Sequence, residues 1–285
     1  MSPFEDDWAD VLPDHGKQAR DLRRANLIHW IGGIAERPSP PVLIVHDQTV
    51  ERERLILSAL ASAPEGTTMT GLVLNPTWSK DAAAEAFVSA LSWLVAPGTK
   101  DPSAWAWLEQ VMSKPRSVIQ NPLQSVLNSQ DIDGPACVAI RFVLDAQAAL
   151  RERDQVTHEH LKGALSAWLS GGSPGSTYKQ LSGKGRSASH PATARSRLDA
   201  LCALFAFAVD QGVFQHPVIV LDEPPRGRAV EAVVRMVPVL KIVASWCERL
   251  GTTPIGIVLG VKTSHVRSIL STPELKGMVT TLSAT

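Results

Sequence analysis

Residues 216–225 read His-Pro-Val-Ile-Val-Leu-Asp-Glu-Pro-Pro, and this stretch decides the fold. Four apolar residues, 218–221, run directly into two acids, Asp222 and Glu223. A short apolar run of this kind is typical of a strand that is buried on both faces of a parallel sheet. Open α/β sheets bind ligands at the carboxyl ends of such strands, which is where the two acids fall. The alternative is a core strand followed by a charged, proline-rich turn.

The composition predicts a packed core but no particular partner. Apolar residues make up 44% of the 285 positions, enough for one large domain or two small ones. The 28 basic side chains equal the 28 acidic ones, so any nucleic-acid signal has to be local. Three widely spaced cysteines indicate reduced thiols, and we expect a cytoplasmic protein. We expect no signal peptide and no membrane span, because no apolar run reaches about 18 residues.

Other apolar runs alternate with helical patterns along the chain. Further strands are expected at residues 42–45, 71–74, 255–259 and 278–282, and helices at residues 17–34, 50–63, 81–95 and 198–214. Strands that alternate with helices predict a parallel sheet with right-handed crossovers. We therefore predict an α/β fold with about five parallel strands.

A long helical tract separates two parts of this predicted core. The predicted organisation is a flexible acidic arm (1–16), the first part of the core (17–95), a helical insertion (96–170), a flexible basic loop (171–197) and the second part of the core (198–285). The insertion is expected to pack as a subdomain against the sheet.

The segment after residues 42–45 has the strand–loop–helix setting of a phosphate-binding P-loop. The motif G-x-x-x-x-G-K-[ST] uses glycine N–H groups to wrap phosphates and a lysine to neutralise them. Residues 46–54 read His-Asp-Gln-Thr-Val-Glu-Arg-Glu-Arg and contain neither glycine nor lysine. Arg52 or Arg54 could supply charge, but an arginine on a helix does not rebuild the cradle. A phosphate site of this type would therefore be degenerate.

The order of these features resembles the AAA+ and STAND branch of the P-loop ATPases. The matching parts are an entry helix, first strand and helix (25–63), a long helix and Walker B strand (198–223), a sensor-1 strand (255–263) and a last strand (278–282). Residues 167–172 and 197–223 are also similar to ATPases of the BREX phage-exclusion type. The resemblance covers residues 20–285, but it lacks the Walker A residues and the helical lid with its sensor-2 arginine.

The resemblance implies roles for the two acids of the opening stretch. In a Walker B strand the first acid, here Asp222, holds Mg²⁺, and the second, here Glu223, orients the attacking water. Lys262 or Thr263 would stand near the sensor-1 position. Because the phosphate cradle is missing, we expect vestigial acids and no cofactor. The alternative is an ATPase that binds ATP and Mg²⁺ through an unorthodox loop at residues 171–187.

The predicted loop at residues 171–197 combines a Gly/Ser-rich stretch with unopposed positive charge. Its basic candidates for nucleic-acid contact are Lys179, Lys184, Arg186, Arg195 and Arg197. Such a segment suits the phosphate backbone of DNA or RNA, and basic residues at 17–24 would extend it if both lay on one face. The alternative is a solvated loop without a partner.

Two further groupings bear on metal and protein binding. His158 and His160 are two positions apart and do not share a helix face, so zinc is not expected. Trp105 and Trp107 point in different directions on a predicted helix, 103–112, which suggests one buried ring and one exposed ring. An exposed ring would favour a protein interface.

The sequence thus favours a catalytically degenerate AAA+-like subunit of a larger machine, in phage defence or DNA processing. We expect it to dock onto a protein partner or a second copy of itself, through residues 269–282 or 103–112, or to associate with DNA. The alternatives are a nucleotide-switched ATPase and a stand-alone nucleic-acid binder.

Overall fold

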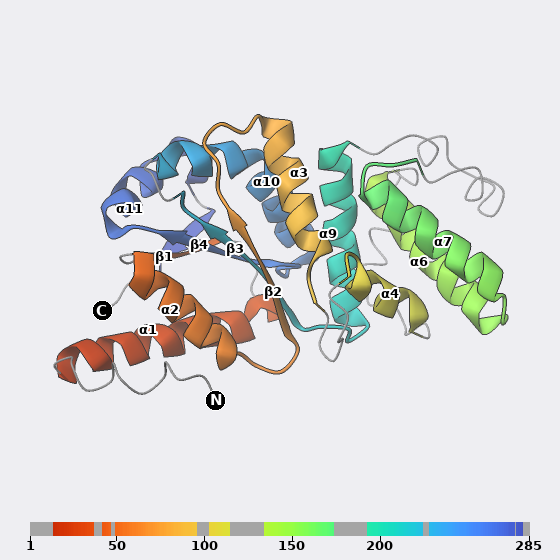
Figure 1. Ribbon diagram of the computed structural model, residues 1–285, viewed down its shortest axis with the longest axis horizontal. Helices are drawn as coiled ribbons and strands as arrows, with labels where there is room; N and C mark the ends of the chain where they lie inside the picture. The colour runs from red at the N-terminus through yellow and green to blue at the C-terminus, as the bar shows by residue number, and fades with distance from the viewer. Residues whose placement is uncertain are drawn as a thin grey trace.

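The computed structural model describes residues 14–36, 42–46, 49–95, 103–114, 134–173, 193–224, 228–276 and 278–281. At its centre is a parallel sheet with the strand order β2-β3-β4-β1-β5. The strands are β1 (Val42–His46), β2 (Thr67–Val73), β3 (His216–Asp222), β4 (Gly256–Val261) and β5 (Val279–Thr281). The predicted α/β architecture with a parallel sheet is therefore present (Figure 1).

Helices cover both faces of this sheet. They are α1 (Asp14–Gly32), α2 (Thr49–Ala61), α3 (Lys80–Ser92), α4 (Ala106–Ser113), α6 (Pro135–Arg151), α7 (Gln155–Leu169), α9 (Ala194–Asp210), α10 (Ala229–Leu250) and α11 (Thr263–Leu270), with short 3₁₀ turns at Ile34–Glu36 and Pro273–Leu275. Of these, α1 and α2 lie on one face, and α3, α9 and α10 lie on the other. No helix in the described ranges is long and apolar enough to cross a membrane.

Burial on both faces explains the apolar runs of the central strands. Leu43 and Val45 of β1 join the core beneath α1 and α2, whereas Val42 and Ile44 join the larger core on the opposite face. Successive side chains of a strand point to opposite faces, so both sets have to be apolar. The alternation of the sheet thus fixes which side chains reach each helical layer.

Helices α4, α6 and α7 form a subdomain against α9, at the right of Figure 1, whereas α11 packs beside α10 and β1. Its core contains both tryptophans of the predicted interface helix: Trp105 is 6% exposed and Trp107 is fully buried. Trp107 stacks on Phe205 with the ring centroids 4.7 Å apart. The prediction that one of these rings is exposed is therefore wrong. Trp105 precedes α4 rather than lying within it, so helical spacing did not govern its direction.

Strand β2 is longer than predicted and begins four residues earlier, at Thr67. It occupies the edge of the sheet, where it pairs with β3 on one side. Its first half is threonine-rich and half-buried, which gives no apolar run in the sequence. Asp154 caps the N-terminus of α7, because its carboxylate accepts the Thr157 N–H at 3.0 Å.

The parallel register brings the carboxyl ends of three strands to one edge of the sheet. Asp222 of β3 lies opposite Gly260 of β4, and His46 of β1 lies opposite Val261. Glu223 extends this alignment, since its backbone N–H donates to the Gly260 carbonyl at 3.0 Å. Side chains from β1, β3 and β4 therefore converge there.

Candidate functional site

A cluster of charged side chains lies at this carboxyl edge. It consists of Arg52 from α2, Asp222 and Glu223 after β3, and Lys262 and His265 at the start of α11. We call these five residues the acid–arginine cluster. His46 lies beside them, with its Nδ1 atom 3.3 Å from the Thr263 hydroxyl.

Arg52 is the centre of the cluster and is fully buried. Its Nη2 atom lies 2.8 Å from Oδ1 of Asp222, and its Nη1 atom lies 3.9 Å from Oε1 of Glu223. Burying a guanidinium without a counter-charge is strongly unfavourable, so the two acids are what allow it to leave water. Arg52 is thus a fixed internal cation held against both acids.

Gly260 makes room for this contact. A Cβ atom at this position would lie 2.8 Å from Oδ1 of Asp222 and 3.0 Å from Nε of Arg52. Those separations are shorter than non-bonded atoms tolerate, so a larger residue would push the ion pair apart. The glycine therefore serves close approach of side chains from β3 and α2.

Glu223 is held in place by the start of α11. Its Oε2 atom accepts the Lys262 backbone N–H at 2.8 Å and lies 3.0 Å from Nδ1 of His265. Its Oε1 atom lies 3.5 Å from the Lys262 ammonium. A carboxylate at a helix N-terminus interacts favourably with the helix dipole. Glu223 thus acts as an anchor between β3 and α11, with its side chain only 2% exposed.

The two acids differ in their proton affinity. Burial raises the pKa of Asp222 above its ordinary value, more than the nearby Arg52 guanidinium lowers it. Burial also acts to raise the pKa of Glu223, but the Lys262 N–H, His265 and Arg52 together outweigh it, and the pKa is lowered. Glu223 is therefore the acid whose ionised form the fold stabilises.

The cluster contains the two acids that the sequence singled out and adds residues that it did not. From the sequence, Arg52 and Arg54 were considered only as possible sources of charge for a phosphate. In the structure Arg52 is buried and Arg54 is exposed. A signal was present: Arg52 shares helical spacing with the buried residues Leu55, Ile56 and Ala59. His265 lies on α11, a helix that the sequence analysis did not predict.

The acids of the cluster form no evident metal site. Within the part of the chain that the structure describes, no group of three or more His, Cys, Asp or Glu side chains could hold a metal ion. At Asp222 the nearest positive charge is the Arg52 guanidinium. A cation such as Mg²⁺ would have to compete with that guanidinium for Oδ1 of Asp222.

The predicted nucleic-acid residues divide into three groups. Lys179, Lys184 and Arg186 lie outside the described residues, and Arg195 is exposed near the start of α9. Arg197 is only 5% exposed and pairs with Glu85 of α3. We therefore correct its assignment: Arg197 is a buried structural residue rather than a phosphate contact. The basic residues of α1 do not join Arg195, because α1 and α9 lie on opposite faces of the sheet (Figure 1).

The predicted docking segments are also largely internal. Ile269 and Leu275 are buried, as are the rings of Trp105 and Trp107. Among the described residues of these segments, Leu270 is the one large apolar side chain with substantial exposure, at 45%. An apolar docking surface therefore has to be sought elsewhere on the molecule.

Comparison with known proteins finds no match for this chain among protein-family models, curated proteins or solved structures. Its function therefore has to be inferred from its own residues and contacts.

Proposed function

We propose that this chain is a P-loop-type subunit that has lost nucleotide binding and acts as a non-catalytic component of a larger assembly. The adjacency of β1, β3 and β4 supports the P-loop type, because it brings the Walker-B-like acids beside the start of α2 and the sensor-1-like residue Lys262. These are the parts that meet around nucleotide in the ATPases the sequence resembles.

The observation that carries the proposal is the burial of Arg52 against Asp222 and Glu223. In an active site of this class, Asp222 would hold Mg²⁺ and Glu223 would orient water. Here a guanidinium neutralises the first acid, and the start of α11 engages the second. Moreover, β1 ends at His46 and α2 begins at Thr49, which leaves two residues where a phosphate cradle needs several backbone N–H groups.

The alternative phosphate loop at residues 171–187 receives no support from the residues on either side of it. Gly171 lies against Arg197, where a Cβ atom would be 3.3 Å from Nη1. Both belong to the helical layer of α9, on the opposite face of the sheet from α2 and Arg52.

Calorimetry with ATP and Mg²⁺ tests the loss of nucleotide binding. We expect no saturable heat that depends on both Mg²⁺ and Asp222. A stoichiometric isotherm in the micromolar range that disappears in Asp222→Ala would show a working nucleotide site and overturn the proposal.

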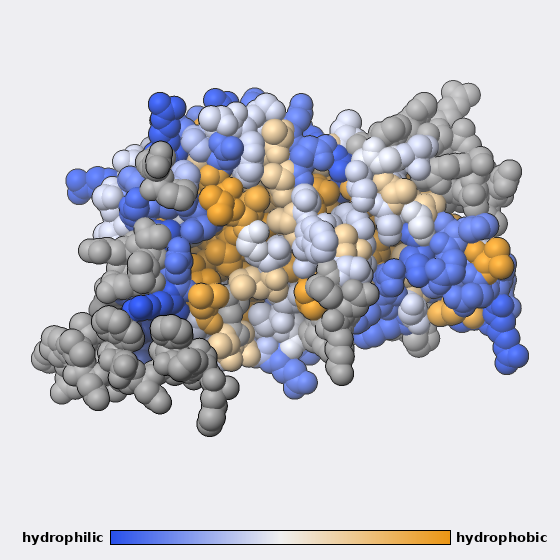
Figure 2. All heavy atoms as spheres, viewed as in Figure 1, coloured by the Kyte–Doolittle hydropathy of each residue, from blue (hydrophilic) through white to orange (hydrophobic). Residues whose placement is uncertain are grey.

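A docking role is supported by apolar surface at the free edge of the sheet. Val73 at the end of β2 is 57% exposed, and Trp93 and Val95 after α3 are 54% and 41% exposed. Val95 lies beside β2, because its carbonyl accepts the Thr68 hydroxyl. Figure 2 shows hydrophobic surface over β2, between α2 and α3. We call Val73, Trp93 and Val95 the β2 surface.

Strand β2 also lacks the features by which edge strands avoid pairing. Its residues, Thr-Thr-Met-Thr-Gly-Leu-Val, include no charge and no proline. The free edge is therefore suited to another strand, from a second copy or from a protein partner.

Val73→Lys tests this docking role, with Val156→Lys as the matched control. Val156 is 66% exposed on α7, in the helical subdomain remote from β2. We expect the wild type and the control to form the same oligomer or partner complex by light scattering and pull-down, and Val73→Lys to lose it. A strictly monomeric wild type without a specific partner, or equal behaviour of both variants, would contradict docking at β2.

A further inference from the structure

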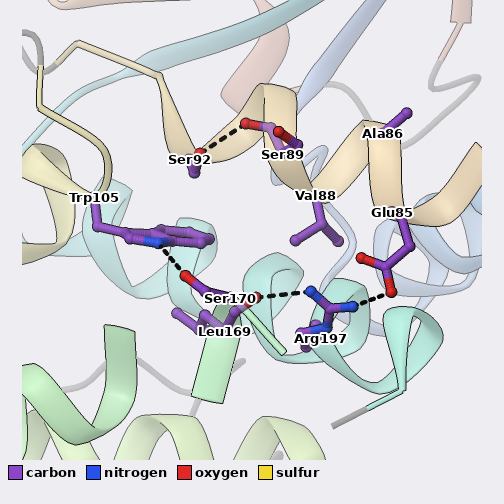
Figure 3. A pocket seen from close by; sticks show the side chains of 9 residues that line it. All are labelled: Glu85, Ala86, Val88, Ser89, Ser92, Trp105, Leu169, Ser170 and Arg197. Carbon is purple, nitrogen blue, oxygen red and sulfur yellow. Dashed lines mark hydrogen bonds and ion pairs between the residues drawn. The ribbon is translucent and has the colours of Figure 1, made fainter. Parts of the chain in front are cut away.

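A hollow of about 450 Å³ opens between α3, α9 and the end of α7. It lies on the α9 face of the sheet and shares no residue with the acid–arginine cluster. Its volume falls within the range of small-molecule sites in proteins. Figure 3 shows the Trp105 indole at one end and the Arg197–Glu85 pair at the other, with Val88 and Leu169 between them.

The charged end of the hollow is rigidly built. Arg197 donates from Nη1 to the Leu169 carbonyl at 3.2 Å and pairs through Nη2 with Oε1 of Glu85. Gly171, in a left-handed conformation with φ of 87°, passes close to the guanidinium, where a side chain would crowd it. The pair is internally neutral, so this end does not select for a charged ligand. The Glu85 side chain is half exposed and pairs with Arg197 through Oε1, so its second oxygen, Oε2, can accept a hydrogen bond from a ligand.

The aromatic end is held in a strained conformation. Trp105 has φ of 68°, in the left-handed region that non-glycine residues rarely adopt. Its backbone N–H donates to the Ser92 carbonyl at 2.7 Å, and its indole Nε1 donates to the Ser170 hydroxyl at 3.0 Å. Strained residues of this kind concentrate at ligand sites, where surrounding contacts hold them in place.

The polar groups of the hollow define what it can bind. The Ser170 oxygen already accepts the indole N–H, so its own O–H is left to donate. Glu85 offers a carboxylate oxygen that accepts. Between these groups the walls are aromatic and aliphatic. A complementary ligand is flat and uncharged, with an amino group next to a ring nitrogen that accepts.

We propose that this hollow is a binding site for an amino-bearing heterocycle of the adenine or cytosine type. The amino group donates to Glu85, the ring nitrogen accepts from Ser170, and the ring lies between the Trp105 indole and the aliphatic wall. Uracil and hypoxanthine present a carbonyl oxygen in place of the amino group. In the same ring orientation that oxygen faces the Glu85 carboxylate, so these rings can pair their ring N–H with Glu85 only by turning over or shifting by one atom, which moves the ribose, and we expect them to bind more weakly.

The test uses nucleosides, because they carry the ring without phosphates. Adenosine, cytidine, uridine and inosine are titrated into the full chain without Mg²⁺, by calorimetry and by NMR of the indole N–H signals. The Trp105 signal is assigned from its absence in Trp105→Phe. Glu85→Gln removes the carboxylate at similar size, and Asp81→Asn on the exposed side of α3 is the control.

We expect adenosine and cytidine to bind saturably and to shift the Trp105 signal, with uridine and inosine at least about tenfold weaker. Glu85→Gln should weaken adenosine about tenfold, and Asp81→Asn should leave it unchanged. Absence of saturable binding up to millimolar nucleoside, shifts confined to other tryptophans, or equal binding by Glu85→Gln would overturn the site. Binding of ATP with Mg²⁺ that is lost in Asp222→Ala but kept in Glu85→Gln would refute the proposed function instead.

Discussion

Replacement of Arg52 by methionine should destabilise the fold strongly, because it leaves two acids in the interior without their cation. Methionine keeps much of the aliphatic volume, so the change isolates the charge. Breaking a buried ion pair from one side costs about 3–5 kcal/mol. The Asp222 side chain is 27% exposed, and Glu223 keeps its contacts with Lys262 and His265. These two features place the expected loss of unfolding free energy near the lower end of this range, at about 3 kcal/mol.

Chemical and thermal unfolding measure this loss. A change of about 3 kcal/mol corresponds to a fall of about 5 °C in the unfolding midpoint, because the unfolding entropy of a chain of 285 residues is about 0.6 kcal/mol/K. The control is Arg54→Met, an exposed arginine on the same helix, which should change stability by less than about 0.5 kcal/mol. The double variant Arg52→Met with Asp222→Asn should recover part of the loss, because one of the uncompensated charges is gone.

Two results would refute this reasoning. If Arg52→Met unfolds at the same temperature and urea concentration as the wild type, the ion pair does not stabilise the fold. If the double variant is no more stable than Arg52→Met, the loss does not arise from an uncompensated charge on Asp222.

Three further predictions concern Glu223, Gly260 and the basic segment. The folded-state pKa of Glu223 lies below its ordinary value near 4.5, so the stability that its ionised form contributes is present above that value and is lost as pH falls through the lowered pKa. The urea midpoint of Glu223→Gln should therefore differ most from that of the wild type at pH 7 and least in the acid range. A difference that stays constant with pH would contradict this. Gly260→Ala should lower the free energy of unfolding by about 1–3 kcal/mol, because the added Cβ clashes with Asp222 and Arg52. The control Gly163→Ala, in α7, meets no atom within 4 Å and should raise the free energy of unfolding by about 0.5–1 kcal/mol. Equal shifts of the two thermal midpoints would contradict the close approach at Gly260. If the basic segment contacts DNA, duplex binding should weaken steeply with salt, and changing Lys184, Arg186 and Arg195 to serine should reduce that slope; an unchanged slope would leave the segment without this role.

The sequence predicted the strands that are buried on both faces. It missed contacts between residues that are far apart in the chain. Val218 and Ile219 are buried on opposite faces, so an apolar run was a sufficient signal for β3. Arg197 stands unopposed in the sequence, yet its counter-charge, Glu85, comes from α3, more than a hundred residues away. An ion pair between residues so far apart produces no recognisable pattern in the neighbouring sequence.

The candidate site was predicted in the same uneven way. Asp222 and Glu223 were found because they follow directly on a strand. Their relation to Arg52 depends on the packing of α2 against the sheet and on the missing side chain of Gly260. The buried position of Trp105 likewise depends on one left-handed residue that no periodicity reveals.

The placement of the helical subdomain has a consequence for how the chain reaches this fold. Strands β2 and β3 are hydrogen-bonded neighbours, but about 140 residues separate them, and that interval contains α3, α4, α6, α7 and α9. Closing so long a loop is slow and loses chain entropy before the strand contacts repay it. Helix α9, which leads directly into β3, packs against α3 within that interval. The β2–β3 ladder is therefore expected to form after the β3–β4 ladder, whose strands are separated by only about 30 residues, and hydrogen exchange during refolding should protect the amides of β4 before those of β2.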